Sequence, residues 1–172
     1  MLLISPKGVA DTITLVTTDW QPFQGSNLHR QGFTAEITRQ ALARSGHTLS
    51  LSFMPWARAV LLTKKGQYHG LLNVWKNKYR ERNFHLSKEA LAHAKGHFLS
   101  LKNRKLKNLQ PGDLRGMHLG VIQGYATSKE LATLISSGAI QKTVVADTLQ
   151  LIRMLQSGRL DIILENNLVA QY

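Results

Sequence analysis

Aromatic and arginine side chains in this sequence fall where predicted strands end. Trp20 follows a first predicted strand and Trp56 follows a second. A third predicted strand ends around Asn73 and Trp75, with Arg80 just beyond. In open α/β sheets, ligands bind outside the carboxyl ends of the strands. A guanidinium can grip a carboxylate through two parallel hydrogen bonds, and aromatic faces can hold a side chain or a cation beside it. Together these residues predict a site for a small polar or anionic solute.

A second candidate element is the run Gly120-Val121-Ile122-Gln123-Gly124-Tyr125, which reads as a strand, a glycine turn and the start of a helix. Free backbone amides at a helix N-terminus attract anions such as carboxylates. Many strand-to-helix turns use glycine, so the turn alone is unspecific. In combination with Arg80, it predicts a second wall of the solute site.

The chain carries none of the common catalytic signatures. It has no GxSxG, Walker-type GxxxxGK[ST], GxGxxG or HExxH motif, and it has no cysteine. His93 and His97 are four residues apart, but Gly96 between them weakens a helix and no third metal ligand is evident. We therefore expect no catalytic residue, no cofactor and no metal site, and we expect a binding protein, not an enzyme.

Positive charge is concentrated in one part of the chain. The formal net charge is +12, and residues 58–107 hold 13 Lys or Arg against 2 Asp or Glu. Such an uneven field favours anionic partners. A nucleic-acid-binding module is one reading, with Trp56, Trp75 and Tyr79 as stacking faces. Helical or repeated basic spacing does not occur, so a solvated surface on a protein that handles small anions is favoured and nucleic acid is not expected.

The hydrophobic pattern predicts two successive βαβαβ units. In the first unit, strands at 13–17, 48–53 and 70–74 alternate with helices at 33–45 and 56–65. In the second unit, strands at 118–122, 142–146 and 160–164 alternate with helices at 126–135 and 148–157, and a further short strand is expected at 97–101. This alternation predicts an α/β fold of mostly parallel sheets with flanking helices.

Four segments follow from this pattern. Residues 1–10 resemble the end of a secretory signal peptide, 11–101 form a first lobe, 102–107 a basic connection, and 108–172 a second lobe. No apolar run approaches the roughly 18 to 20 residues that a membrane-spanning helix needs.

From about Asp11 onward, an ordered set of short motifs resembles the family 3 extracellular solute-binding proteins, which serve ABC transporters for polar amino acids. The motifs are Trp20-Gln21-Pro22-Phe23, Gly32-Phe33, Trp56-Ala57-Arg58-Ala59, residues 66–70, 80–87, Asp113-Leu114-Arg115-Gly116, 120–125 and 155–161. The resemblance implies a periplasmic-binding-protein-like, two-lobed clamshell that closes about a hinge and docks on a membrane permease. It also implies a periplasmic or extracellular location and contact with the membrane only through the transporter.

The resemblance assigns site residues. Arg80, seven residues before Ser87, matches the arginine that holds the ligand α-carboxylate, Trp20 and Trp56 match the aromatic walls, and Asn73 and Trp75 fall near a loop that supplies ligand hydroxyls. On the second lobe the matching turn contains Ile122, Gly124, Tyr125, Ala126 and Thr127.

Two positions and the length of the chain depart from the family pattern. Asn166, beside Glu165, stands where the family has the aspartate for the ligand ammonium, and a neutral amide loses most of that attraction. His69 stands where an aspartate is common. The chain also ends before the family's return to lobe one, which predicts a truncated clamshell with an uncovered sheet edge and apolar surface on that lobe. A non-binding fragment and a sensory domain of the same fold remain as alternatives.

Overall fold

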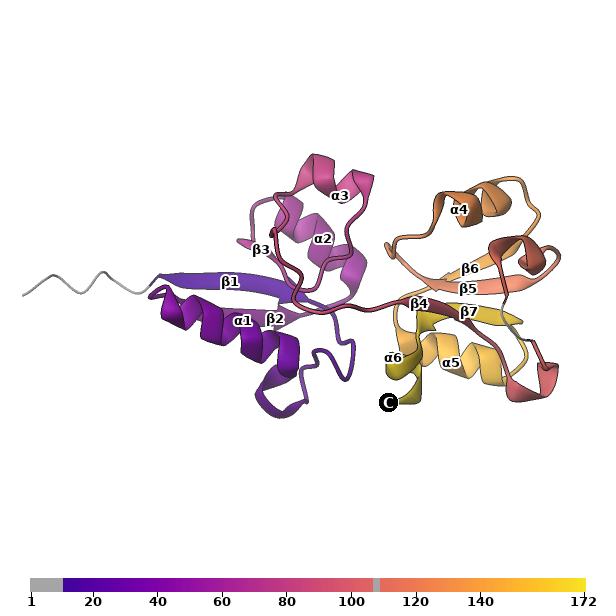
Figure 1. The fold of residues 1–172 in the computed structure, drawn as a ribbon, viewed down its shortest axis with the longest axis horizontal. Coiled ribbons are helices and arrows are strands. Elements are labelled where there is room, and N and C mark those ends of the chain that lie inside the picture. The colour runs from indigo at the N-terminus through magenta and orange to yellow at the C-terminus, as the bar shows by residue number, and fades with distance from the viewer. Residues whose placement is uncertain (1–10, 107–108) are drawn as a thin grey trace, which may run out of the picture.

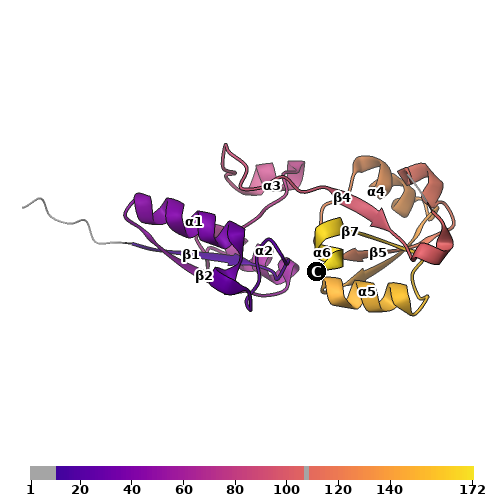
Figure 2. The same cartoon turned by 60° about the horizontal axis from the view of Figure 1, so that its bottom comes forward.

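Residues 11–106 and 109–172 are described by a computed structural model, in which the chain forms two α/β lobes, each built on its own sheet (Figures 1 and 2). The predicted signal-peptide remnant at 1–10, and Lys107 at the end of the predicted connection, lie outside the described residues. Within the described residues, no helix is both long enough and apolar enough to span a bilayer.

The first lobe is a parallel sheet of order β2-β1-β3. Its strands are β1 (Thr12–Thr17), β2 (Thr48–Phe53) and β3 (Gly70–Leu71), and each is followed or preceded by a crossover helix as predicted. The helices are α1 (Phe33–Arg44), α2 (Trp56–Lys64) and α3 (Lys78–Asn83). In Figure 1, α1 lies on one side of the sheet, and α2 and α3 lie on the other.

The strand predicted at 70–74 ends after Leu71. Asn73 adopts a φ of 58°, in the left-handed region that interrupts an extended chain. The side-chain amide of Asn73 donates to the Gln24 side-chain oxygen and, at 3.1 Å, to Thr34 Oγ1. Gln24 in turn donates to Thr17 Oγ1 at 3.2 Å, so a largely buried polar network joins the loops at Gln24 and Asn73 to the end of β1 and the start of α1.

Helix α1 does not bury the apolar residues whose helical spacing predicts it. Phe33 and Ile37 are each 45% exposed, whereas Thr34 and Ala35 are fully buried. The side of α1 that packs on the sheet therefore contains Thr34, whose hydroxyl donates to the Phe23 carbonyl at 2.9 Å. This helix therefore carries exposed apolar side chains on the surface of the first lobe.

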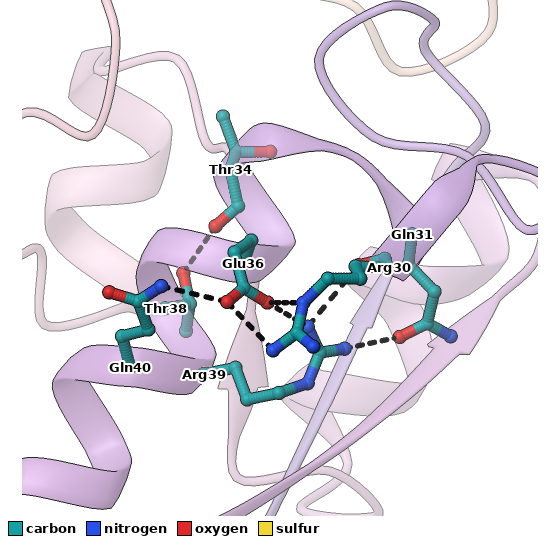
Figure 3. A network of polar contacts seen from close by, with 7 residues as sticks. All are labelled: Arg30, Gln31, Thr34, Glu36, Thr38, Arg39 and Gln40. Atoms are coloured by element: carbon teal, nitrogen blue, oxygen red, sulfur yellow. Dashed lines mark hydrogen bonds and ion pairs between the residues drawn. The ribbon is translucent and has the colours of Figure 1, made fainter.

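The start of α1 is held by a charged network around Glu36 (Figure 3). Arg30 donates to both carboxylate oxygens of Glu36 at 2.7 and 2.8 Å, Arg39 donates to it at 2.7 Å, and Gln40 at 2.8 Å. Arg30 and Gln31 both have positive φ values, of 49° and 66°, which non-glycine residues seldom adopt. The network thus fixes a strained turn before the helix.

The second lobe is a mixed sheet of order β4-β7-β5-β6. Its strands are β4 (Gly96–Leu99), β5 (His118–Ile122), β6 (Gln141–Val145) and β7 (Ile162–Asn166). Its helices are α4 (Lys129–Ser136), α5 (Thr148–Gln156) and α6 (Asn167–Gln171), and short 3-10 turns occur at His29–Gln31, Lys102–Arg104 and Pro111–Leu114.

Strand β4 corrects the predicted lobe boundary. The sequence placed this strand in the first lobe, at residues 11–101, but it pairs antiparallel with β7 in the second sheet, with Phe98 opposite Leu164. The second lobe therefore begins before the basic connection. Arg104, within that connection, forms an ion pair with Asp161 of the second lobe. A chain that joins a sheet antiparallel needs no crossover helix, so the βαβ pattern predicted this strand but not the sheet that it joins.

The first residues of α4 and β7 differ from the predicted ones for local reasons. The helix predicted at 126–135 begins at Lys129, because the Ser128 side chain accepts from the Leu131 amide at 3.1 Å and caps it. The last strand begins at Ile162, not Leu160, because the Asp161 side chain turns to accept from the His118 amide at 2.7 Å. Asp147 caps α5, because its side chain accepts from the Gln150 amide at 2.8 Å.

The second lobe has an apolar core on both faces of its sheet. One cluster includes Leu119, Leu131 and Ile162, and the other includes Leu151 and Ile163. Gly120, in the central strand, permits the close approach of α5, since a Cβ there would lie 2.5 Å from Leu160 Cδ1 and 2.7 Å from Leu151 Cδ2.

This difference in packing predicts that the second lobe carries more of the stability. Leu151→Ala should lower the free energy of unfolding by about 2–5 kcal/mol, because it opens a cavity in a full core. Ile37→Ala, on the exposed stripe, should change it by less than about 0.5 kcal/mol. Urea unfolding followed by circular dichroism measures both, and equal losses would contradict the description.

The Glu36 network predicts a dependence on pH. Hydrogen bonds from Arg30 and then from Gln40 hold the pKa of Glu36 at about 2, below its usual 4.5. A carboxyl with a depressed pKa contributes its stability above the usual pKa and loses it as the pH falls through the folded value. The difference in melting temperature between the natural chain and Glu36→Gln should therefore be full above pH 5 and shrink toward pH 2. A constant difference across this range would contradict it.

Candidate ligand-binding cleft

A small cavity of about 50 Å³ lies between the two lobes. Eight of the predicted site residues line it, from α2, α3, β7 and the loops around them: Trp20, Trp56, Asn73, Trp75, Arg80, Tyr125, Ala126 and Asn166. Five further residues complete the lining: Thr18, Gln24, Gly96, Leu164 and Glu165. Since one water needs roughly 10–15 Å³ by this measure, the cavity has room for only a few, and a larger solute requires the lobes to separate.

Arg80 connects the lobes at one end of this cavity. It lies on α3, where the Asn77 side chain caps the helix by accepting from the Arg80 amide at 2.8 Å. Its guanidinium donates through Nη1 to the Trp75 carbonyl at 2.6 Å and through Nη2 to the Gly124 carbonyl of the second lobe at 3.2 Å. The guanidinium carbon also lies 5.1 Å from the centre of the Trp56 ring.

The charge of Arg80 is buried without a carboxylate partner. The residue is 4% exposed, and no ion pair among the described residues includes it. Burial lowers the pKa of Arg80, yet a guanidinium stays charged at neutral pH. A buried cation bonded only to neutral carbonyls is costly, and an anion that reached it would relieve that cost.

The turn at Gly124 presents a carbonyl to the first lobe. Gly124 O accepts from both Arg80 and Trp56 Nε1, the latter at 3.2 Å, and the Tyr125 amide is bonded to Ile122 O at 3.1 Å. The helix start predicted in this turn does not lie here, because α4 begins only at Lys129. Gly124 itself, with φ of 79°, allows the approach, since a Cβ would lie 3.2 Å from Trp56 Cδ1.

Glu165 places a carboxylate on the second-lobe wall. The residue is 3% exposed at the end of β7. Its Oε1 accepts from Trp20 Nε1 of the first lobe at 3.0 Å and from the Asn166 amide at 2.7 Å, and its Oε2 accepts from Thr148 Oγ1 at 2.6 Å. Trp20 thus bridges the lobes through a charged hydrogen bond.

Tyr125 lies within the electrostatic influence of both charged residues. Burial raises the pKa of its phenol well above the usual 10, the carboxylate of Glu165 raises it further, and Arg80 lowers it. The phenol is therefore a neutral donor at any physiological pH. The cavity therefore combines the cation of Arg80, the anion of Glu165 and the neutral hydroxyl of Tyr125.

Trp75 lies over the strand that begins the second lobe. A Cβ at Gly96 would lie 3.3 Å from Trp75 Cη2, so the glycine gives the indole room. The ring also meets Trp20 edge-on, with centroids 6.3 Å apart, and Trp20 stacks on Phe23 at 4.4 Å. All three tryptophans of the chain therefore line the cavity.

Several predicted ligand residues are occupied by structural contacts. The Asn166 amide donates to Lys95 O at 3.0 Å, and its oxygen accepts from the Leu168 amide at 2.9 Å, which caps α6. Asn73 belongs to the buried Gln24 network. Ile122 is buried in the second-lobe core, and Thr127 lines a shallow groove beside α4, not the cavity. His69, the other departure, is bonded through Nδ1 to Thr14 Oγ1 at 2.7 Å.

Within the described residues, no group of three or more His, Asp or Glu side chains is placed to hold a metal ion. His93 lies in a loop and His97 in β4, so the helical pair considered from the sequence does not form.

Two of the lining residues that the sequence did not select could have been found from it. Glu165 lies at the carboxyl end of a predicted strand, as the other candidates do, directly before Asn166. Gln24 lies four residues after Trp20 in the same loop. Gly96 and Leu164 gave no signal, because their place depends on the antiparallel β4–β7 pair.

Several solved structures that align with this chain are described as amino-acid-binding proteins. An ancestral arginine-binding protein bound to arginine aligns with a TM-score of 0.80 at 17% identity, over 95% of this chain and 73% of its own. An amino acid ABC transporter substrate-binding protein from Streptococcus pneumoniae, bound to L-arginine, aligns at 0.78 and 19% identity, over 93% and 69%.

An ancestral amino-acid-binding protein described as a precursor of cyclohexadienyl dehydratase aligns at a TM-score of 0.73 and 20% identity, over 94% of this chain and 73% of its own. No protein-family profile and no curated protein sequence matches the chain. The two-lobed fold predicted from the sequence is thus confirmed by structural similarity.

The Trp20 to Glu165 bond predicts that the lobes separate when it is removed. Trp20→Phe keeps a ring to stack on Phe23 but loses a hydrogen bond to a charged group, which contributes about 1.5–3 kcal/mol. The population of open molecules should rise by tenfold or more, which increases the radius of gyration in small-angle X-ray scattering. Trp75→Phe, whose indole makes no such bond, is the matched control, and an equal effect of both variants would contradict the assignment.

Proposed function

We propose that this chain is a non-catalytic receptor for a small amino-acid-like solute, which it delivers to an ABC transporter outside the cytoplasm. The observation that carries this proposal is the pair of opposite charges on the two walls of one cavity, Arg80 on the first lobe and Glu165 on the second. A zwitterion presents the complementary pair of charges. Solutes of that class therefore suit this cavity better than simple anions do.

Arg80 is suited to bind the solute carboxylate. The guanidinium has five N–H donors, and the described contacts use one on Nη1 and one on Nη2. When the lobes open, the bond to Gly124 O is lost, and a carboxylate can replace that carbonyl as a stronger, charged acceptor. The Trp56 ring beneath the guanidinium keeps water from the same face.

Glu165 is suited to bind the ammonium group. Its Oε2 accepts only from Thr148 among the described contacts, so a lone pair remains for a donor. This supplies the anionic group that Asn166 lacks, one residue earlier in the strand. The sequence-based objection to an α-amino acid, which rested on Asn166, is therefore weakened.

The fold comparison supports the same class of ligand. The neighbours at TM-scores of 0.80 and 0.78 are bound to arginine, and a further structure shows an ancestral arginine-binding protein bound to glutamine. These are binding proteins, which supports a non-catalytic role for this chain. Delivery to a permease and a periplasmic or extracellular location are part of the proposal, because transporter substrate-binding proteins share the fold.

Isothermal titration with single amino acids and with dicarboxylates of similar size tests the proposal. We expect binding of at least one amino acid, and we expect Arg80→Gln and Glu165→Gln each to weaken it by tenfold or more, since each removes a charge-assisted hydrogen bond. Arg82→Gln, on the exposed side of the same helix, is the matched control and should bind as the natural chain does.

Circular dichroism of each variant separates loss of binding from loss of folding. A folded protein that binds dicarboxylates and no amino acid would contradict the role given to Glu165. A folded protein that binds none of these solutes would contradict the receptor proposal as a whole.

A further inference from the structure

A cluster of cations and exposed apolar side chains lies on the outer side of the first lobe. We call it the basic ridge, and it consists of Arg58, Leu61 and Lys64 on α2 and Lys78, Tyr79 and Arg82 on α3. All six side chains are exposed, Leu61 by 51% and Tyr79 by 52%. Lys64 Nζ lies 5.8 Å from the centre of the Tyr79 ring, so the two helices form one surface (Figure 1).

The spacing of these residues keeps them on the outside of their helices. Residues three or four apart share a helix face, which groups Arg58 with Leu61 and Lys64 on α2, and Tyr79 with Arg82 on α3. Trp56 and Arg80, on the same two helices, face the cavity instead. The ridge is therefore separate from the cleft, although the same helices carry both.

The positive charge of the basic ridge is not neutralised by acidic side chains among the described residues. Between Trp56 and Phe84 the only acid is Glu81, and its carboxylate is paired with Lys76 at 3.2 Å. None of the four ridge cations takes part in an ion pair among the described residues. The ridge thus concentrates part of the +12 net charge on one exposed surface.

We propose that the basic ridge binds the surface of an anionic lipid bilayer directly. Cations that stand beside an exposed leucine and tyrosine match the pattern of surface-bound amphipathic segments, in which apolar groups enter the headgroup region and cations meet lipid phosphates. Tyrosine is also enriched at that depth. From the sequence, we expect this protein to reach the membrane only through a transporter. The basic ridge would add a direct contact with the lipid.

Nucleic acid fits the ridge less well. Binding of single strands depends on a series of aromatic faces for successive bases, whereas the ridge offers only Tyr79, and Lys64 already lies over its ring. Exposed Leu61 adds nothing to phosphate contacts. The apolar pair Leu61 and Tyr79 therefore distinguishes a bilayer from a polyanion.

Co-sedimentation of the natural chain with vesicles of equal parts phosphatidylglycerol and phosphatidylcholine tests the proposal, with pure phosphatidylcholine vesicles alongside. We expect binding to the anionic vesicles alone. Lys64→Gln with Lys78→Gln should reduce the partition coefficient by tenfold or more, since each cation near an anionic surface contributes roughly a fivefold factor. Leu61→Ser with Tyr79→Ser should reduce it several-fold.

The matched control is Lys129→Gln with Lys142→Gln, which removes two exposed cations from the second lobe. It should bind vesicles as the natural chain does. The proposal would be overturned by failure to bind anionic vesicles, or by equal losses in the control. Unchanged binding of the Leu61 and Tyr79 variant would also overturn it, as would tighter retention on DNA than on vesicles. Circular dichroism confirms that each variant is folded.

Discussion

A buried guanidinium without a carboxylate partner is the constraint around which the cleft is organised. Arg80 is held by two main-chain carbonyls, one from its own lobe and one from the other, and by the face of Trp56. Neutral acceptors stabilise a buried cation less than an anion does. The closed arrangement therefore satisfies Arg80 only in part, and a solute carboxylate can improve on it while it still holds the lobes together.

The two lobes differ in a way that suits this task. The second lobe has a core on each side of its sheet, so Glu165 and the Gly124 turn stand on a rigid support. In the first lobe, the buried polar network and the Glu36 cluster fix loops more than they fill a core. Across the described residues the chain passes between the lobes once, near 84–95 (Figure 2). Closure thus depends on a few contacts across the cleft.

Local pattern in the sequence predicted the elements, and the rule that ligands meet strand ends predicted most of the cleft. Trp20, Trp56, Trp75 and Arg80 all line the cavity as expected. The pairing of β4 with β7 was not predictable from the sequence. More than sixty residues separate the two strands, and hydrophobic periodicity does not indicate which strand is the antiparallel partner. The same pairing brings Gly96 and Leu164 to the site. The exposed stripe of α1 shows a further limit, since periodicity predicts a helix but not which face is covered.

Arginine side-chain NMR during titration with the tightest-binding amino acid tests the central claim most directly. In protein labelled with ¹⁵N-arginine, the account predicts that the guanidinium resonances of Arg80 shift in step with binding, and that those of exposed Arg82 stay in place. Binding that saturates while the Arg80 resonances remain unchanged would contradict the claim that this buried cation receives the solute carboxylate.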